Sequence, residues 1–563
     1  MTTSAEAMRT PEELPIVVAA VVKYVHYQIV VHVDRFGHYL NYLVQFVTSN
    51  LQQQWRAHTL PPSPYAGWSR EQLIERLQSL EGPAKLSVDT PPAVNDIEKP
   101  KPSTRKFNFY EYPRRKIALR FSYSGWEYGG LAFQIDDTPL PTVEGVLFDT
   151  LSKARLVDEE AGFDGCGWER CGRTDKGVSG AGQVVSLWVR SALPTDELAE
   201  SITGTTHVPV PVSRDALEAE PLSDGIERRE PKEQSRNEHD YVTILNRMLP
   251  ETIRISAWSP VSSTFSPRFS CLWRHYKYLF SPKDLDISKM QDAASRLIGE
   301  HDFRNLCKLD AAKQITSFKR NILDAHIEKY NDNLHIFNLI GSAFLYNQVR
   351  HIMAVLFLVG TGLEPPSIVT TLMNVSEGCE PPNGDDPQPY PVVDRKPEYH
   401  MADGLPLMLW DCGYPDGTFS WRTSGRLPSD EFKDLGELQR EMQNIVTRSH
   451  ITAALNEHFQ QAVARHHPAP PSIFPLDKPS QLQERRGPQQ AFAVPLGGGS
   501  AHRVVKWVPV LQRKRLDPVE VANERWRVGK GTRKAERRRI AAEGDLEAVQ
   551  QLEKVAASGG GAS

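Results

Sequence analysis

Asp175 is the residue whose type and surroundings most strongly indicate chemistry. It stands in the run CGRTDKGVSG (residues 171–180), between two glycines and close to Arg173 and Lys176. Glycines permit sharp turns with positive φ, and a carboxylate fixed on a turn beside a strand is well placed to act on a substrate. A bare G-x-T-D-x-G sequence is more often a capped surface turn, so the rest of the chain must decide between these interpretations.

The elements that would position this turn form a strand–helix–turn–strand unit. Residues 117–123 alternate in the manner of a half-buried strand, and residues 182–190 (GQVVSLWVR) predict a second strand directly after the turn. Between them, Thr142 is a typical N-cap for a helix whose apolar stripe runs from residue 143 to 154.

A second block of strands and helices follows. We expect a short helix at 241–249, followed by three strands and two longer helices. The strands are 273–280, 334–344 and 407–414, and the helices are 284–298 and the strongly apolar 346–359. Arg350 is the one charge in that last helix. Two such blocks predict an α+β fold with a cleft between them.

Composition shifts divide the chain into five parts. We assign residues 1–110 to an N-terminal extension and linker, 111–206 to a first catalytic subdomain, 207–240 to an insertion, 241–426 to a second catalytic subdomain, and 427–563 to a C-terminal extension with a basic tail.

Two further segments have a distinctive composition. Residues 364–400 are rich in proline and are expected to form loops. The tail run 530–539 (KGTRKAERRR) fits RNA contact, a solvated surface or nuclear targeting equally well.

Whole-chain composition says little about the function of the protein, but it favours an intracellular protein. Among 563 residues the net charge is −4, so the overall balance does not indicate a nucleic-acid-binding protein. The six cysteines form no C-x-x-C pair, which favours reduced thiols and predicts no metal site. The apolar run 15–33 contains Lys23 and two histidines and lacks the layout of a secretory signal, so no membrane partner is expected.

Four ordered motifs besides the Asp175 turn strengthen the functional interpretation. They are YSGWEYGG at 123–130, FSPRFS at 265–270 with RHYKY at 274–278, AFLYNQVR at 343–350, and GLPLML at 404–409. With GRTDKGVSG and GQVVSL, their order and spacing between about residues 116 and 414 resemble those of the tRNA pseudouridine synthase I family. Gly180 departs from that pattern, since the family usually has alanine there.

The resemblance implies a site and a reaction. Asp175 would be the catalytic carboxylate, Tyr276 would stack on the target uracil, Arg350 would pair with Asp175, and Arg173 would help to displace or hold the nucleotide. The implied fold has two subdomains of mixed or antiparallel sheet flanked by helices, with a central basic cleft. The implied reaction converts uridine to pseudouridine in tRNA without a cofactor or a metal. Family members are often homodimers, and the basic tail is compatible with a location in both nucleus and cytoplasm.

Several alternatives stay open. Taken singly, Tyr276 could be a core tyrosine, Arg350 a helix-surface residue and Arg173 a turn cap. We expect Phe269 to be a packing residue. The motifs look most like the eukaryotic branch that modifies uridines 38 and 39 in the anticodon arm. The alternatives are a sister branch acting on other tRNA or small nuclear RNA positions, a catalytically silent tRNA-binding protein, and a scaffold protein.

Overall fold

The computed structural model describes residues 107–135, 138–193, 237–384, 386, 389–424, 436–485 and 490–532. Most of the expected N-terminal extension, most of the 207–240 insertion and most of the 530–539 basic run lie outside these residues. The apolar run 15–33 lies outside them as well. In the part that is described, no helix has the length and apolar character needed to cross a membrane.

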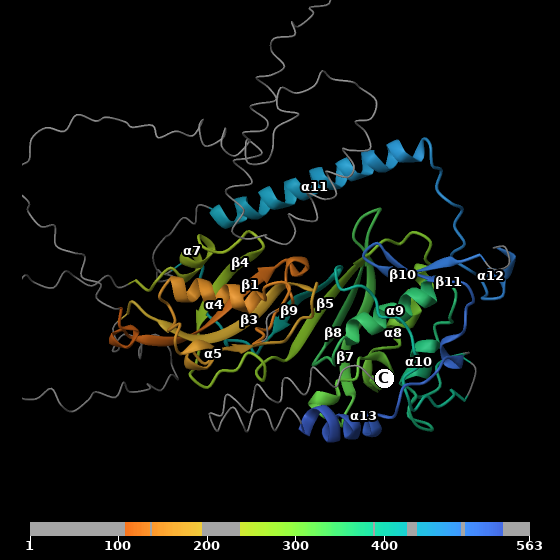
Figure 1. The fold of residues 1–563 in the computed structure, drawn as a ribbon, viewed down its shortest axis with the longest axis horizontal. Helices are drawn as coiled ribbons and strands as arrows, with labels where there is room; N and C mark the ends of the chain where they lie inside the picture. The colour runs from red at the N-terminus through yellow and green to blue at the C-terminus, as the bar shows by residue number, and fades with distance from the viewer. Residues whose placement is uncertain are drawn as a thin grey trace, which may run out of the picture. The chain divides into compact units, whose positions relative to one another are not determined.

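One nine-stranded mixed sheet organises the described chain (Figure 1). Its strands are β1 (Arg114–Tyr123), β2 (Glu169–Arg170), β3 (Ser179–Arg190), β4 (Ile253–Pro260), β5 (Trp273–Phe280), β6 (Gly299–Asp302), β7 (Lys319–Lys329), β8 (His335–Gly341) and β9 (Leu407–Gly413). The order is β4-β1-β3-β9-β5-β8-β7-β6, and β2 pairs with β3. The sheet and its helices confirm the predicted α+β class.

The two halves of the sheet, β4-β1-β3 and β9-β5-β8-β7-β6, meet where β3 lies beside β9. This pair is parallel, with Ser179 opposite Met408 and Gly180 opposite Leu409, so the sheet is mixed and not antiparallel throughout. At Gly182 an added Cβ would lie 2.6 Å from the Trp410 carbonyl oxygen. A glycine is therefore required for the close approach of the two strands.

The helices of the first half pack beside β1, β3 and β4 (Figure 1). They are α4 (Val143–Lys153), α5 (Gly162–Gly165) and α7 (Tyr241–Asn246). The Thr142 side chain accepts a hydrogen bond from the Gly145 amide, which confirms the predicted N-cap. Although α7 and β4 come after residue 240, Tyr241 and Trp258 belong to the same buried cluster as α4.

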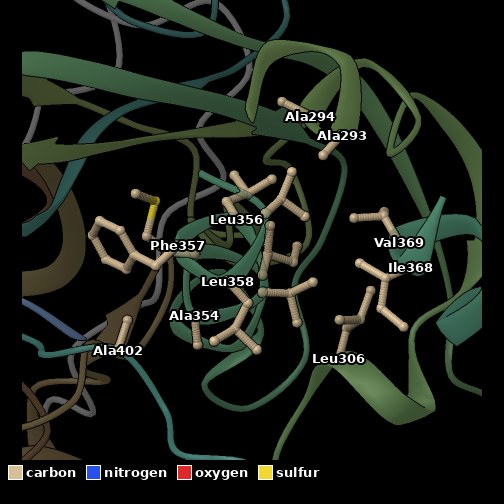
Figure 2. Packing of buried hydrophobic residues seen from close by; sticks show 14 of the residues in the cluster. Ala293, Ala294, Leu306, Ala354, Leu356, Phe357, Leu358, Ile368, Val369 and Ala402 are labelled. Carbon is tan, nitrogen blue, oxygen red and sulfur yellow. The ribbon is translucent and has the colours of Figure 1, made fainter. Parts of the chain in front are cut away.

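The core of the second half is built around α9 (Gln348–Gly360), with α8 (Ile287–Ser295) and α10 (Ile368–Met373) beside it (Figure 2). Every residue of α9 except Arg350 is buried. All six residues of α10 are buried as well. The expectation that 364–400 forms only loops is therefore wrong, because α10 supplies apolar side chains such as Ile368 and Val369 to this core (Figure 2).

Part of the C-terminal extension completes the same core. It contains α11 (Glu437–Ala464), α12 (Gln481–Glu484), the hairpin of β10 (Phe492–Gly497) and β11 (Ser500–Val504), and α13 (Val519–Trp526). Five of its apolar side chains are buried in the α9 cluster: Leu476, Leu482, Phe492, Val494 and Val510. None of the described α11 residues is buried.

The remaining elements are single helical turns. The 3-10 turns are Phe109–Glu111, Gly125–Glu127, Arg304–Leu306, Ala311–Lys313 and Val510–Gln512, and a π turn spans Arg527–Gly531.

Most predicted elements are found with boundaries shifted by a few residues. The strand predicted at 273–280 is found there as β5. The helix predicted from 346 begins at Gln348, because Asn347 has a φ of 56° that an α-helix cannot contain. Ala118 is buried like its neighbours Ile117 and Leu119, so this part of β1 is covered on both faces and not half-buried.

Candidate active site

The Asp175 motif forms the expected turn between β2 and β3. The Val178 amide donates to the Asp175 carbonyl oxygen at 3.1 Å, and Gly177 takes a φ of 83° that favours glycine. The side chain of Asp175 is half-buried, whereas Arg173 and Lys176 on either side are exposed. The turn therefore holds a partly desolvated carboxylate between two solvated cations.

The YSGWEYGG motif (residues 123–130) packs against this turn. An added Cβ at Gly125 would lie 2.1 Å from the Val178 carbonyl oxygen, so glycine is needed where the two segments touch. The Leu131 amide donates to the Thr174 carbonyl oxygen at 3.3 Å, and the Thr174 hydroxyl lies 2.7 Å from the Tyr123 hydroxyl. These contacts fix the residue next to Asp175.

The departure of Gly180 from the family pattern has a local explanation. Gly180 lies opposite Tyr123 in the β1–β3 pairing, and an added Cβ would lie 2.6 Å from Cε1 of the Tyr123 ring. Glycine leaves room for a ring that in turn positions Thr174 through its hydroxyl. The substitution therefore belongs to the support of the turn.

Arg274 and Gln183 support the turn from the sheet. The Arg274 guanidinium donates to the carbonyl oxygens of Cys171 at 3.2 Å, Arg268 at 3.0 Å and Ser342 at 2.8 Å. Gln183 donates to the Gly172 carbonyl oxygen at 2.9 Å. Arg274 thus joins its own motif to the Asp175 turn and to the residue that precedes AFLYNQVR, a role that the sequence analysis did not assign to it.

Asn347 is the residue that contacts the Asp175 carboxylate directly. Its Nδ2 donates to Asp175 Oδ2 at 2.6 Å. Asn347 is also the residue that precedes α9, so the carboxylate lies at the N-terminal end of that helix. Both the amide hydrogen bond and the partial positive charge of a helix N-terminus favour the ionised form of a carboxyl group.

Arg350 lies one turn further along α9 and acts on Asp175 at longer range. Its Nε donates to the Ala402 carbonyl oxygen at 2.8 Å, and an added Cβ at Gly404 would lie 3.5 Å from its Cζ. Among the described residues, Arg350 and Asp175 form no ion pair within 4.0 Å. Arg350 is near the carboxylate, as the resemblance implied, but the contacting group is Asn347.

Burial and positive charge act on Asp175 in opposite directions. Burial raises the pKa of the carboxyl group above its ordinary value, while Arg350, the Asn347 hydrogen bond, Lys313 and Lys308 lower it. Burial is the larger effect, so the pKa of Asp175 remains raised. The surrounding cations limit that rise and favour the ionised form that an acid–base or nucleophilic role requires.

Lys308 and Lys313 form an exposed cationic pair around Tyr346. Their Nζ atoms lie 5.5 Å and 5.1 Å from the centre of the Tyr346 ring, and the Lys308 amide donates to the Tyr346 carbonyl oxygen. Because both lysines also lower the pKa of Asp175, their charges lie near the site. Sequence reasoning missed them, since a lysine in a polar stretch gives no signal by itself.

Tyr276 is half-buried on β5, opposite Leu409 of β9. Its ring meets the Phe344 ring edge-on at a centroid distance of 5.0 Å. Phe269 is 81% exposed, with the Arg268 guanidinium 5.3 Å from its ring centre, so its interpretation as a packing residue is wrong. An exposed aromatic ring beside an arginine is instead suited to stacking on a base.

The geometry thus gathers all five motifs around one carboxylate. A profile of the tRNA pseudouridine synthase family matches residues 293–415. The tRNA pseudouridine(38/39) synthase of Saccharomyces cerevisiae is 37% identical over 477 residues, which is 82% of this chain and 92% of the yeast protein. The chain belongs to the tRNA pseudouridine synthase family.

Other similar proteins are also tRNA pseudouridine synthases, with different sequence identities and coverages. The human tRNA pseudouridine(38/39) synthase is 39% identical over 355 residues, covering 61% of this chain and 64% of the human protein. The tRNA pseudouridine synthase A of Methanothrix thermoacetophila is 29% identical over 304 residues, covering 54% and 84%. Identity is thus higher to these two eukaryotic proteins than to the archaeal one.

Proposed function

We propose that this chain is a tRNA pseudouridine synthase that isomerises uridine 38 or 39 in the anticodon arm. The observation that carries the reaction is the Asp175 carboxylate, held on a rigid turn and hydrogen-bonded to Asn347. The position of the uridine follows from the two eukaryotic relatives, both named for positions 38 and 39.

The reaction needs a carboxylate and a pocket, and no cofactor. The bond between C1′ of the ribose and N1 of the uracil breaks, the base turns, and a bond forms between C1′ and C5. N1 gains a proton and C5 loses one, so the product is an isomer of the substrate. Both ends of the new bond are already held in one pocket, which favours their recombination.

Asp175 is proposed to act on the sugar in its ionised form, as nucleophile at C1′ or as base. Either role requires that the partly desolvated carboxyl group be deprotonated near neutral pH. Asn347, the α9 N-terminus and the nearby cations supply that bias.

The surrounding residues are proposed to hold the extracted nucleotide. A uridine in a folded RNA must leave its stack before chemistry can occur. Tyr276 is proposed to stack on the uracil, and Arg173, Lys308 and Lys313 to bind nearby phosphates. The exposed Phe269 is suited to a neighbouring unpaired base.

The proposal also covers the tRNA-binding surface, the oligomeric state and the location of the protein in the cell. We propose that the two halves of the sheet act as subdomains around a basic tRNA-binding cleft, and that the protein works as a homodimer in nucleus and cytoplasm. The family's use of tRNA and the mixed α+β sheet support the first point. The basic C-terminal run supports nuclear entry.

Tritium release tests the reaction. tRNA transcribed with uridine labelled at C5 must lose tritium when the C1′–C5 bond forms. We expect release by the wild type and at least about a 10³-fold loss in Asp175→Asn, with tRNA binding retained. Asp332→Asn, which changes a fully exposed carboxylate, is the matched control and should release tritium normally.

Mapping the modified nucleotide then distinguishes the alternatives. Modification at 38 or 39 supports the proposal, and modification elsewhere in the same tRNA pool supports the sister branch. Binding of tRNA without release by the wild type would indicate a catalytically silent protein. Equal release by Asp175→Asn and wild type would refute the assignment of Asp175.

A further inference from the structure

Three cysteines from distant parts of the chain converge beside the Asp175 turn. Cys171 lies at the start of the turn, Cys271 two residues before β5, and Cys412 within β9. Their sulfur atoms all lie within 4.8 Å of one another, and the sulfurs of Cys171 and Cys412 are 3.3 Å apart. Cys171 and Cys412 are buried, and Cys271 is half-buried.

The spacing of the three sulfurs suits a thiophilic metal. Zinc binds thiolates at about 2.3 Å in tetrahedral geometry, which places neighbouring sulfurs about 3.8 Å apart. The Cys171–Cys412 separation of 3.3 Å is shorter than that value, and no two of the three sulfurs are more than 4.8 Å apart. Small side-chain adjustments would therefore bring all three sulfurs onto one ion.

The charges around the cluster also fit a bound cation with three thiolates. The Arg274 guanidinium lies beside the cluster, because it donates to the Cys171 carbonyl oxygen at 3.2 Å. Zn²⁺ with three thiolates would carry one net negative charge, and the Arg274 guanidinium would balance it.

We propose that Cys171, Cys271 and Cys412 bind one Zn²⁺ ion that fixes the base of the catalytic turn. On binding, each S–H bond releases its proton to solvent, and three Zn–S bonds form without any change of oxidation state. A water molecule would take the fourth position. Cys412 and Tyr414 help to line a cavity of 230 Å³, which is large enough to hold water beside the cluster.

The position of the site gives the ion a positioning role in the proposed reaction. Cys171 is four residues from Asp175, and its carbonyl oxygen already accepts a hydrogen bond from Arg274. An ion on Cys171, Cys271 and Cys412 would join the turn to β5 and β9, the strands that carry Tyr276 and Leu409. This positioning role rests on the proposed function, whereas the metal site itself does not.

Metal content tests the site independently of catalysis. The full chain is purified without chelator, and its metal content is measured by elemental mass spectrometry. We expect about one zinc ion per chain. Replacement of the zinc by Co²⁺ should give intense sulfur-to-cobalt charge-transfer absorption in the near ultraviolet. Cys271→Ser and Cys412→Ser should each lose most of the zinc and the absorption band.

A matched control is Cys166→Ser, which changes a buried thiol outside the cluster and should keep the metal. Full metal retention in both Cys271→Ser and Cys412→Ser would overturn the proposal. So would a metal-free wild type with six thiols that react with a thiol reagent after unfolding. A metal-free wild type with only four reactive thiols, restored to six by a reductant, would indicate a disulfide instead.

The two assays distinguish a failure of the proposed reaction from a failure of the proposed metal site. If the wild type binds zinc but releases no tritium, the metal site stands and the proposed reaction fails. If it releases tritium without zinc, or with all three cysteines free, the reaction stands and the metal site fails.

Discussion

The hydrogen bond from Asn347 to Asp175 predicts a pH-dependent defect when the amide is removed. We choose Asn347→Gly, because Asn347 has a φ of 56° and glycine adopts this conformation without strain. The change deletes a donor that lies 2.6 Å from a carboxylate oxygen and leaves the backbone able to begin α9 unchanged.

The magnitude follows from the type of bond. A hydrogen bond to a charged group contributes about 1.5–3 kcal/mol, and each 1.36 kcal/mol corresponds to a tenfold change in an equilibrium constant. The bond lowers the pKa of Asp175, so its loss must raise that pKa further. The ionised fraction on the acid side should therefore fall about 10- to 100-fold, and the acid limb of the rate profile should move to higher pH.

The assay is tritium release under single-turnover conditions across a pH series, for the wild type and Asn347→Gly. We expect the variant to be slow at low pH and to approach the wild type as pH rises through the new limb. Asn331→Gly, at an exposed asparagine of the β7–β8 connection, is the control. A loss that is equal at every pH would refute the electrostatic reasoning, because it would show a misplaced turn instead.

Further predictions concern the substrate and the core. Tyr276→Leu should lower kcat/KM about 5- to 150-fold through lost stacking, whereas Tyr276→Phe should stay near the wild type; equal defects would point to the hydroxyl. Lys308→Ala and Lys313→Ala should each reduce the salt dependence of tRNA affinity by about one phosphate contact, and an unchanged slope would remove them from the interface. Truncation after residue 427 removes five buried side chains worth about 1.5–3 kcal/mol each, so the truncated chain should fail to fold; a wild-type melting temperature would contradict this.

Local signals allowed much of the fold to be predicted from the sequence. Apolar alternation located β5, and the hydroxyl at Thr142 located the start of α4, because both signals depend on neighbouring residues alone. Element ends were less certain where a single residue takes an unusual φ, as at Asn347. The C-terminal residues that fill the α9 core gave no local signal, since their partners lie more than a hundred residues away.

The sequence by itself determined the family and the turn that carries Asp175, because motif order and glycine positions are properties of the chain. Only the tertiary structure decided what surrounds that carboxylate. Asn347 reaches Asp175 across 172 residues of sequence, and three cysteines without a metal-binding spacing meet beside the same turn. Such contacts depend on how β3 and β9 pair at the centre of the sheet, and no spacing along the chain records that pairing.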